Sequence, residues 1–176
     1  TLSDGDFLQA AGSSVVVVLA DRRHIAVQER GQLIVHAPGA GDAVTVEAAG
    51  GRFVVLGGSA PDGSPDLLVI TPAARIHPGS TAIAFHHAAA DGLQVMLAED
   101  EAADGVIADD VVVENGFGRA VIRDGDEVVS VGGPDQPPVL EHDPSLAVAG
   151  TDAGLPQEAT AGLTLAEGLD VSPGGD

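Results

Sequence analysis

Turn-forming residues interrupt this 176-residue chain at short, fairly regular intervals, and this rhythm constrains the fold more than any other feature. Clusters of glycine, proline, asparagine and aspartate recur roughly every 8–16 residues as far as Gly133. The apolar segments between them are five or six residues long, which suits β-strands better than helices. The pattern predicts an all-β domain, built as an antiparallel sandwich, a barrel or stacked sheets.

About 11 short strands are expected. Several alternate apolar and polar residues, as a half-buried strand requires: Val44 and Val46 fall on one side of their segment, and Thr45 and Glu47 on the other. The expected strands are Ser14–Leu19, His24–Gln28, Gln32–His36, Ala43–Glu47, Arg52–Leu56, Asp66–Thr71, Thr81–His86, Leu93–Ala98, Asp110–Glu114, Arg119–Arg123 and Glu127–Val131.

The segment Asp110–Val131 is expected to form a meander of three strands. Asn115-Gly116 and Asp124-Gly125 separate its valine-rich runs, and such dipeptides accept the positive φ of tight hairpin turns. The segment also resembles Gly31–Gly58 in its order of apolar runs and glycine-rich turns. The β domain, residues 1–133, could therefore consist of two similar halves, although chance similarity is the competing explanation in a chain so rich in valine and glycine.

Two smaller expectations concern local structure. Ser3 and Asp6 are typical of a helix cap and first turn, and they predict a short helix through Phe7 and Leu8. The residues Ala49–Gly51 predict a turn between two separate strands.

Composition excludes several functions. The chain has 27 acidic residues, seven Arg and no Lys, which gives a net charge of −20, and its only aromatic residues are four Phe. Such a chain repels phosphate backbones and offers few rings for base stacking, so we expect no nucleic-acid partner. The longest strictly apolar run has six residues, which predicts no membrane insertion. Without Cys there is no disulfide framework and no thiolate metal site.

The negative charge is concentrated in the second half. Residues 1–88 carry eight acids and five Arg, whereas residues 89–176 carry nineteen acids and two Arg. A half of the chain that carries mostly negative charge can face solvent, bind cations or bind a basic partner, and exposure to solvent is the commonest case.

Residues 134–176 are expected to form an acidic, extended arm rich in proline, glycine and aspartate. They contain six of the eleven prolines, eight acids and no Arg. Within residues 161–172, four apolar side chains share one side of a period-two register: Leu163, Leu165, Leu169 and Val171. This pattern predicts a strand that pairs within its own sheet or adds to the edge of a neighbouring subunit, with a short helix as the alternative.

No catalytic motif is found. The chain lacks the nucleophile-elbow pentapeptide of hydrolases and a phosphate-binding glycine loop, and the adjacent His86 and His87 would point to opposite faces of a strand. Calcium is the one cofactor with a physical argument, because six carboxylates lie within residues 99–110. Its candidate ligands are Asp100, Asp104, Asp109 and Asp110. The helix–loop–helix calcium motif nevertheless fails here, since Val111 stands where the bidentate Glu is needed.

The stretch from Thr71 to Gly133 resembles the FecR-like β domain of bacterial envelope and extracellular proteins. The similarity lies in Thr71-Pro72-Ala73-Ala74-Arg75-Ile76, Gly79-Ser80-Thr81, Val111-Val112-Val113-Glu114-Asn115-Gly116, and Gly125 before Val128-Val129. Pro78 stands where that family has Arg, and Ser80 is an extra residue before Thr81. The resemblance covers about a third of the chain. It implies a noncatalytic, all-β envelope or secreted module, and it does not imply sigma-factor signalling.

These observations favour a noncatalytic structural or assembly module of a secreted, cell-surface or filament-forming bacterial protein. It would self-associate, or bind another protein, by β-strand addition at its sheet edges and through the C-terminal arm. A cytoplasmic location stays open. The alternatives are a small-ligand or Ca²⁺-binding β module and an enzyme of unrecognised type.

Overall fold

The computed structural model of this chain describes residues 3–19, 23–28, 30–36, 43–56, 66–98 and 109–143. These residues contain no helix and form thirteen strands. The strands are β1 (Asp6–Gln9), β2 (Val15–Val18), β3 (His24–Val27), β4 (Gln32–His36), β5 (Val44–Leu56), β6 (Leu67–Ile70), β7 (Arg75–His77), β8 (Ile83–Ala88), β9 (Gly92–Leu97), β10 (Val111–Asn115), β11 (Gly118–Ile122), β12 (Glu127–Val131) and β13 (Val139–His142).

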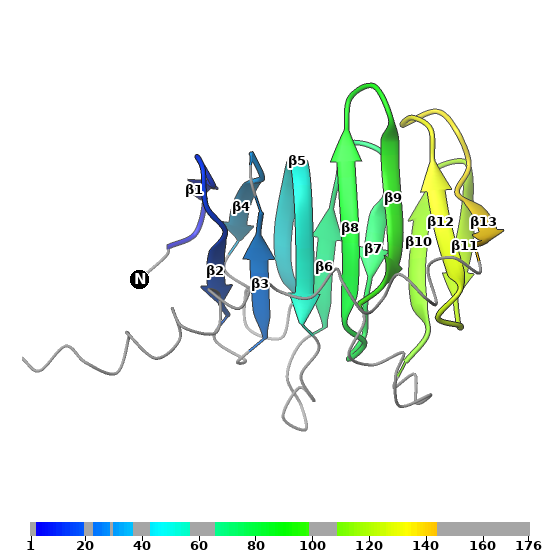
Figure 1. Ribbon diagram of the computed structural model, residues 1–176, viewed down its shortest axis with the longest axis horizontal. Coiled ribbons are helices and arrows are strands. Elements are labelled where there is room, and N and C mark those ends of the chain that lie inside the picture. Colours follow the sequence, from blue (N-terminus) through cyan, green and yellow to red (C-terminus); the bar gives the residue numbers. More distant parts are fainter. Residues whose placement is uncertain are drawn as a thin grey trace, which may run out of the picture.

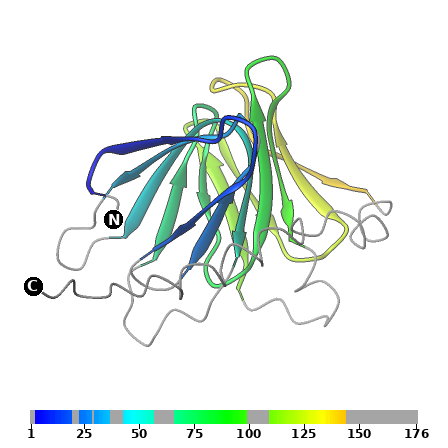
Figure 2. The ribbon, with the colours of Figure 1, turned by 60° about the vertical axis from the view of Figure 1, so that its left-hand side comes forward.

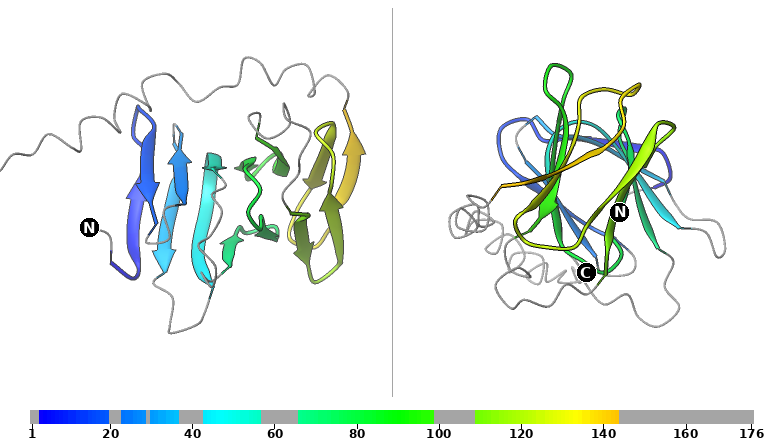
Figure 3. Two further views of the ribbon diagram at one scale, coloured as in Figure 1. Left: turned by 90° about the horizontal axis from the view of Figure 1, so that it is seen from below. Right: turned by 90° about the vertical axis from the view of Figure 1, so that its right-hand side faces the viewer.

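The strands form a sandwich of two facing layers (Figure 3). Layer A has the order β1-β4-β5-β6-β7-β10-β11, and layer B has the order β2-β3-β5-β8-β9-β12-β13. Because β5 belongs to both layers, hydrogen bonding joins all thirteen strands into one continuous sheet. The prediction of an all-β sandwich or barrel is confirmed. The pairing is antiparallel throughout, except that β5 and β6 run parallel.

Strands advance along the long axis of the molecule in nearly the order of the sequence, from β1 to β13 (Figure 1). After β5, hairpins alternate between the layers: β6–β7 lies in layer A, β8–β9 in layer B, β10–β11 in layer A and β12–β13 in layer B. Each layer therefore ends in one edge strand at each end of the sandwich. Strands β1 and β2 form the N-terminal end, and β11 and β13 form the C-terminal end.

The shared strand β5 replaces the two strands predicted around Ala49–Gly51. Its pairing with β4 skips Ala49, so the chain bulges there. The bulge reverses the alternation of buried side chains: Val46 and Ala48 face the core before it, and Phe53 and Val55 face the core after it. Gly51 adopts a φ of 107°, which glycine tolerates and other residues rarely do. The predicted turn is therefore a bend that carries the chain from layer A to layer B.

Three further expectations are corrected. Residues Ser3–Asp6 form a turn and not a helix, because the Asp6 carboxylate accepts a hydrogen bond from the Ser3 amide, 2.6 Å away, and β1 follows. The expected three-stranded meander is a hairpin, β10–β11, followed by a change of layer, since β12 pairs with β9 and β13. Neither Gly116 nor Gly125 has a positive φ. Strands β7 and β13 were not expected, and β13 lies within the segment predicted as an extended arm.

The similarity between Gly31–Gly58 and Asp110–Gly133 has a structural counterpart. In the first segment β4 pairs with β5 in layer A, and β5 then continues into layer B. In the second, β10 pairs with β11 in layer A, and β12 follows in layer B. Both segments therefore pair two strands in layer A before the chain enters layer B, and the expectation of two similar halves stays a prediction.

The core between the layers is built mainly from Val, Leu and Ile, as the composition requires. Two of the four Phe also belong to it. A smaller apolar cluster, made of Ala26, Val54, Ala82 and Ala98, lies apart from this core. The part of the chain that the structure describes contains no helix long and apolar enough to cross a membrane.

Candidate functional site

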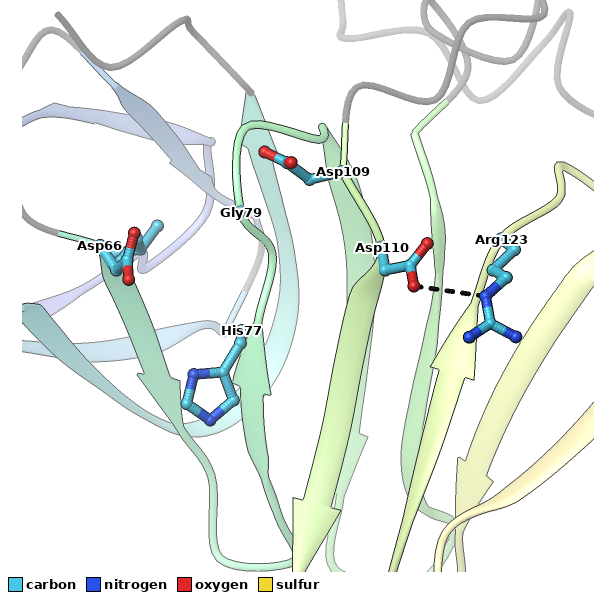
Figure 4. Close-up of a pocket in the computed structure, with 7 residues that line it drawn as sticks. Asp66, His77, Gly79, Asp109, Asp110 and Arg123 are labelled. Carbon is cyan, nitrogen blue, oxygen red and sulfur yellow. Dashed lines mark hydrogen bonds and ion pairs between the residues drawn. The ribbon is translucent and has the colours of Figure 1, made fainter. Parts of the chain in front are cut away.

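A hollow of about 620 Å³ opens where the β6, β7, β10 and β11 segments of layer A lie side by side, and we call it the acidic hollow (Figure 4). It is lined by Asp66, Leu67, His77, Gly79, Asp109, Asp110 and Arg123. Asp66 and His77 lie on its β6–β7 side, and Asp110 and Arg123 on its β10–β11 side. It includes two of the four predicted Ca²⁺ ligands.

Asp109 is engaged by the turn before β8. Its carboxylate accepts hydrogen bonds from the Ser80 amide (3.0 Å) and from the Ser80 hydroxyl (2.6 Å), and these bonds hold the pKa of Asp109 below its ordinary value. Thr81 Oγ1 donates to the Asp109 carbonyl at 2.7 Å and accepts from its amide at 3.0 Å. Gly79 allows the close approach, since a Cβ there would lie 2.7 Å from the Asp109 Cβ. Asp109 therefore links the turn before β8 to the residues before β10, which are far apart in sequence.

Asp110 turns toward a cation of its own chain. Its Oδ2 lies 3.3 Å from Arg123 Nε, and the dashed line in Figure 4 marks this ion pair. The other two predicted ligands, Asp100 and Asp104, lie outside the described residues. Among the residues that are described, no three His, Asp or Glu side chains converge in a way that could hold a metal. Ca²⁺ binding stays a prediction that calorimetry with the metal would test.

Histidines pair with carboxylates across neighbouring strands, a feature that sequence reasoning missed. His36 Nε2 lies 3.1 Å from Glu47 Oε1, and His77 Nε2 lies 3.3 Å from Glu114 Oε1. The expectation that His86 and His87 face opposite sides is confirmed, because burial alternates along β8 and His87 is the buried one. Strand pairing brings these groups together, and sequence spacing alone gives no sign of it.

Two parts of the FecR-like resemblance, Thr71–Ala74 and Asn115, meet at one turn. Thr71 is buried, and its Oγ1 donates to the Ala74 carbonyl at 2.8 Å and accepts from the Ala74 amide at 3.0 Å. Asn115 Nδ2 reaches the same turn, donating to the Ala73 carbonyl at 3.1 Å and to the Gln136 carbonyl at 2.7 Å. These side chains satisfy backbone groups at the junction of β6–β7 with β10–β11, so their role is structural.

Large exposed apolar side chains lie at the two ends of the sandwich. Phe7 on β1 and Val18 on β2 are 57% and 55% exposed at the N-terminal end. Phe117 in the β10–β11 turn is 61% exposed, and Val139 and Leu140 are exposed on β13, at the C-terminal end. These five are the exposed large hydrophobic residues of the described chain.

Sequence reasoning did not single out these five residues. Two of the four Phe, Phe7 and Phe117, lie beside glycine-containing turns, and this position could have indicated that they are exposed. The side chains predicted to anchor an assembly, Leu163, Leu165, Leu169 and Val171, lie outside the described residues. At β13 all four residues are exposed, and this strand pairs with β12 alone.

Comparison with known proteins gives a likeness of fold. No family model matches the sequence, and no curated protein matches it either. Two crystal structures of a putative anti-sigma factor from Parabacteroides distasonis ATCC 8503 are similar to this chain, with TM-scores of 0.61 and 0.58 at 12% and 11% identity.

In both cases the similarity covers 78% of this chain and 60% of the anti-sigma factor chain. This chain therefore spans less than two thirds of the length of those relatives. At such low identity the comparison establishes the all-β architecture.

Proposed function

We propose that this chain is a noncatalytic interaction module that binds a second copy of itself, end to end, through the edge strands of its sandwich. The observation that carries the proposal is the placement of the exposed apolar residues. Phe7 and Val18 lie at one end, and Phe117, Val139 and Leu140 lie at the other. Exposed edge strands with apolar side chains readily pair with another chain.

Strand direction supports a head-to-tail arrangement. Each end offers one edge strand of layer A and one of layer B. If a second copy is translated along the long axis, its β1 lies antiparallel to β11 of the first copy, and its β2 lies parallel to β13. Both are ordinary strand pairings.

Charge also disfavours the meeting of two C-terminal ends. The segment 109–143 at the C-terminal end carries nine acids and two Arg, whereas residues 1–36 carry four acids and three Arg. Two C-terminal ends would repel each other more strongly than a C-terminal end and an N-terminal end.

The fold comparison fits a binding role. An anti-sigma factor is named for its action on another protein and not for a reaction that it catalyses. The proposal includes an extracytoplasmic location, secreted or at the cell surface, which the FecR-like resemblance implies. It also keeps the arm residues Leu163, Leu165, Leu169 and Val171 as anchors that the association with the neighbouring copy requires.

Two variants of the full chain test the arrangement by sedimentation velocity. The N-end variant carries Phe7→Asp and Val18→Asp, and the C-end variant carries Val139→Asp and Leu140→Asp. We expect wild-type protein to associate with rising concentration and each variant to remain monomeric, because a buried unpaired carboxylate disrupts an apolar contact. An equimolar mixture of the variants should form dimers and nothing larger, since each supplies the intact end that the other lacks.

A matched control carries Ala90→Asp and Gln94→Asp, which add the same charge at exposed positions of the β8–β9 hairpin. It should associate like the wild type. A wild-type chain that stays monomeric at all concentrations would refute self-association. A C-end variant that is not rescued by the N-end variant would instead indicate that like ends meet.

A further inference from the structure

A second hollow, of about 810 Å³, opens beside the bend of β5, and its lining is basic. Two Arg and two His line it: Arg30, Arg52, His86 and His87. The rest of the lining is glycine, alanine, serine and glutamine, with no Asp or Glu. We call it the cationic hollow.

This lining is an exception in a chain of net charge −20. The acidic hollow has three Asp in its wall, and His36, His77 and His142 each face a carboxylate. Within the described residues, by contrast, neither Arg30 nor Arg52 forms an ion pair, and the same holds for His86 and His87. The hollow therefore brings together two Arg that form no ion pair within the described residues, and no Asp or Glu lines it.

Strand register places two of the four basic side chains, Arg52 and His86, side by side on one face of layer B, while His87 faces the other side of β8. Arg52 on β5 lies directly opposite His86 on β8, and Gly51 lies opposite His87. His87 Nδ1 is 3.1 Å from the Ala49 carbonyl, which can only accept, so Nδ1 carries the proton of this hydrogen bond.

Arg30 is held at the hollow by an unusual backbone. Its φ is 62°, the one positive φ of a non-glycine residue in the described chain. The Arg30 amide donates to the Ala10 carbonyl at 2.9 Å. The backbones of Gly31 and Gly51 meet beside it so closely that a Cβ on Gly51 would lie 2.4 Å from the Gly31 Cα. Left-handed conformations of ordinary residues cost energy and occur preferentially at functional sites.

We propose that the cationic hollow binds an acidic peptide segment of a partner protein. Guanidinium groups recognise carboxylates with paired, charge-assisted hydrogen bonds, and Arg30 and Arg52 come from different segments, so they can take two successive acidic side chains. Gln28 and Gln32 also line the hollow, and their amides offer the donors and acceptors that a peptide backbone needs. The proposal does not depend on end-to-end association, because none of its residues is among the five exposed apolar residues at the ends.

Fluorescence anisotropy with a labelled ten-residue peptide of alternating glutamate and alanine tests the proposal on the full chain. We expect binding at low ionic strength that weakens as salt is added, and affinity at least about tenfold lower in the double variant Arg30→Gln, Arg52→Gln. The matched control is Arg75→Gln, Arg119→Gln, which removes the same charge at exposed positions of layer A. It should stay within about twofold of the wild type, and a peptide with glutamine in place of glutamate should not bind.

Three results would overturn the proposal. The first is absence of glutamate-peptide binding to the wild type at low salt, and the second is an equal loss of affinity in both double variants. The third is full displacement of the peptide by inorganic phosphate at the same concentration of charge, which would make the hollow a site for small anions. Thermal unfolding followed by circular dichroism checks that each variant is folded, and Arg52→Gln alone serves where the double variant is not.

Discussion

The rings of Phe53 and Phe85 stack on facing positions of β5 and β8, with centroids 4.8 Å apart and planes inclined by 14°. Both side chains are buried, at 0% and 2% exposure. They are the largest buried side chains of a core that is otherwise aliphatic. They lie where the shared strand β5 enters layer B.

Replacing Phe85 with Ala should therefore destabilise the protein strongly. We expect a loss of about 3–5 kcal/mol in the free energy of unfolding, because the change removes a buried ring and leaves a cavity beside Phe53. Urea denaturation measures this. Phe117→Ala is the comparison, since that ring is exposed, and it should cost less than about 1 kcal/mol. Similar losses in both variants would contradict the assignment of Phe85 to the core.

The bend of β5 should not tolerate a side chain. Gly51→Ala would place a Cβ against the Gly31 backbone at a φ of 107°, so we expect a loss of at least about 2 kcal/mol in the free energy of unfolding. Gly116→Ala is the control, because a Cβ there meets nothing within 4 Å and φ is not positive. Thermal unfolding should separate the two variants clearly, and equal melting temperatures would argue against the close approach.

Asn115→Asp should be nearly as harmful as Asn115→Ala. Aspartate keeps an acceptor for the Phe117 amide but loses both hydrogen bonds that Nδ2 donates, and it sets a charge against the Ala73 and Gln136 carbonyls. We expect either change to cost about 1–3 kcal/mol of unfolding free energy in chemical denaturation. A fully stable Asn115→Asp variant would show that the donated bonds matter little.

The contact between Asp109 and Ser80 predicts a pH dependence. Hydrogen bonds from Ser80 lower the pKa of Asp109 in the folded state, so their contribution to stability is present above the ordinary Asp pKa and is lost as pH falls through the lowered value. NMR titration of the Asp109 carboxyl group should show its pKa rising toward the ordinary value in Ser80→Ala. The effect on stability is small because Asp109 is exposed. An unchanged titration in this variant would rule out the Ser80 hydroxyl as the main cause.

The predicted arm is tested by deleting Gly154–Asp176. We expect the β domain to remain folded, since the thirteen described strands all precede this segment, and self-association to be abolished. Sedimentation of the shortened and full chains decides between the outcomes. The same oligomer before and after deletion would remove the arm from the proposed assembly and leave the edge strands as its basis.

Sequence patterns predicted the class of fold and most of the strands, because apolar alternation and turn residues are local signals. They failed where the local structure depends on pairing with strands that are distant in sequence. The residues Ala49–Gly51 look like a turn, and only the facing strands make them a bend. Ser3 and Asp6 have the chemistry of a helix cap, but the residues from Asp6 onward form a strand because they pair with β4.

The candidate sites were predicted less well for the same reason. Asp109 and Asp110 were singled out for their carboxylates, but Ser80 and Arg123, which engage them, come from other segments of the chain. The cationic hollow brings Arg30 beside Arg52 and His86 through strand pairing and the β5 bend. No spacing in the sequence predicts that these basic residues lie together.

Strand β5 has a mechanical consequence for the molecule. In a sandwich held together by side chains alone, the two layers can slide past each other by repacking their contacts. Here one continuous backbone is hydrogen-bonded to β4 and β6 in one layer and to β3 and β8 in the other. A shearing force between the layers therefore acts along a covalent chain, and relative sliding requires the ladders on one half of β5 to break together.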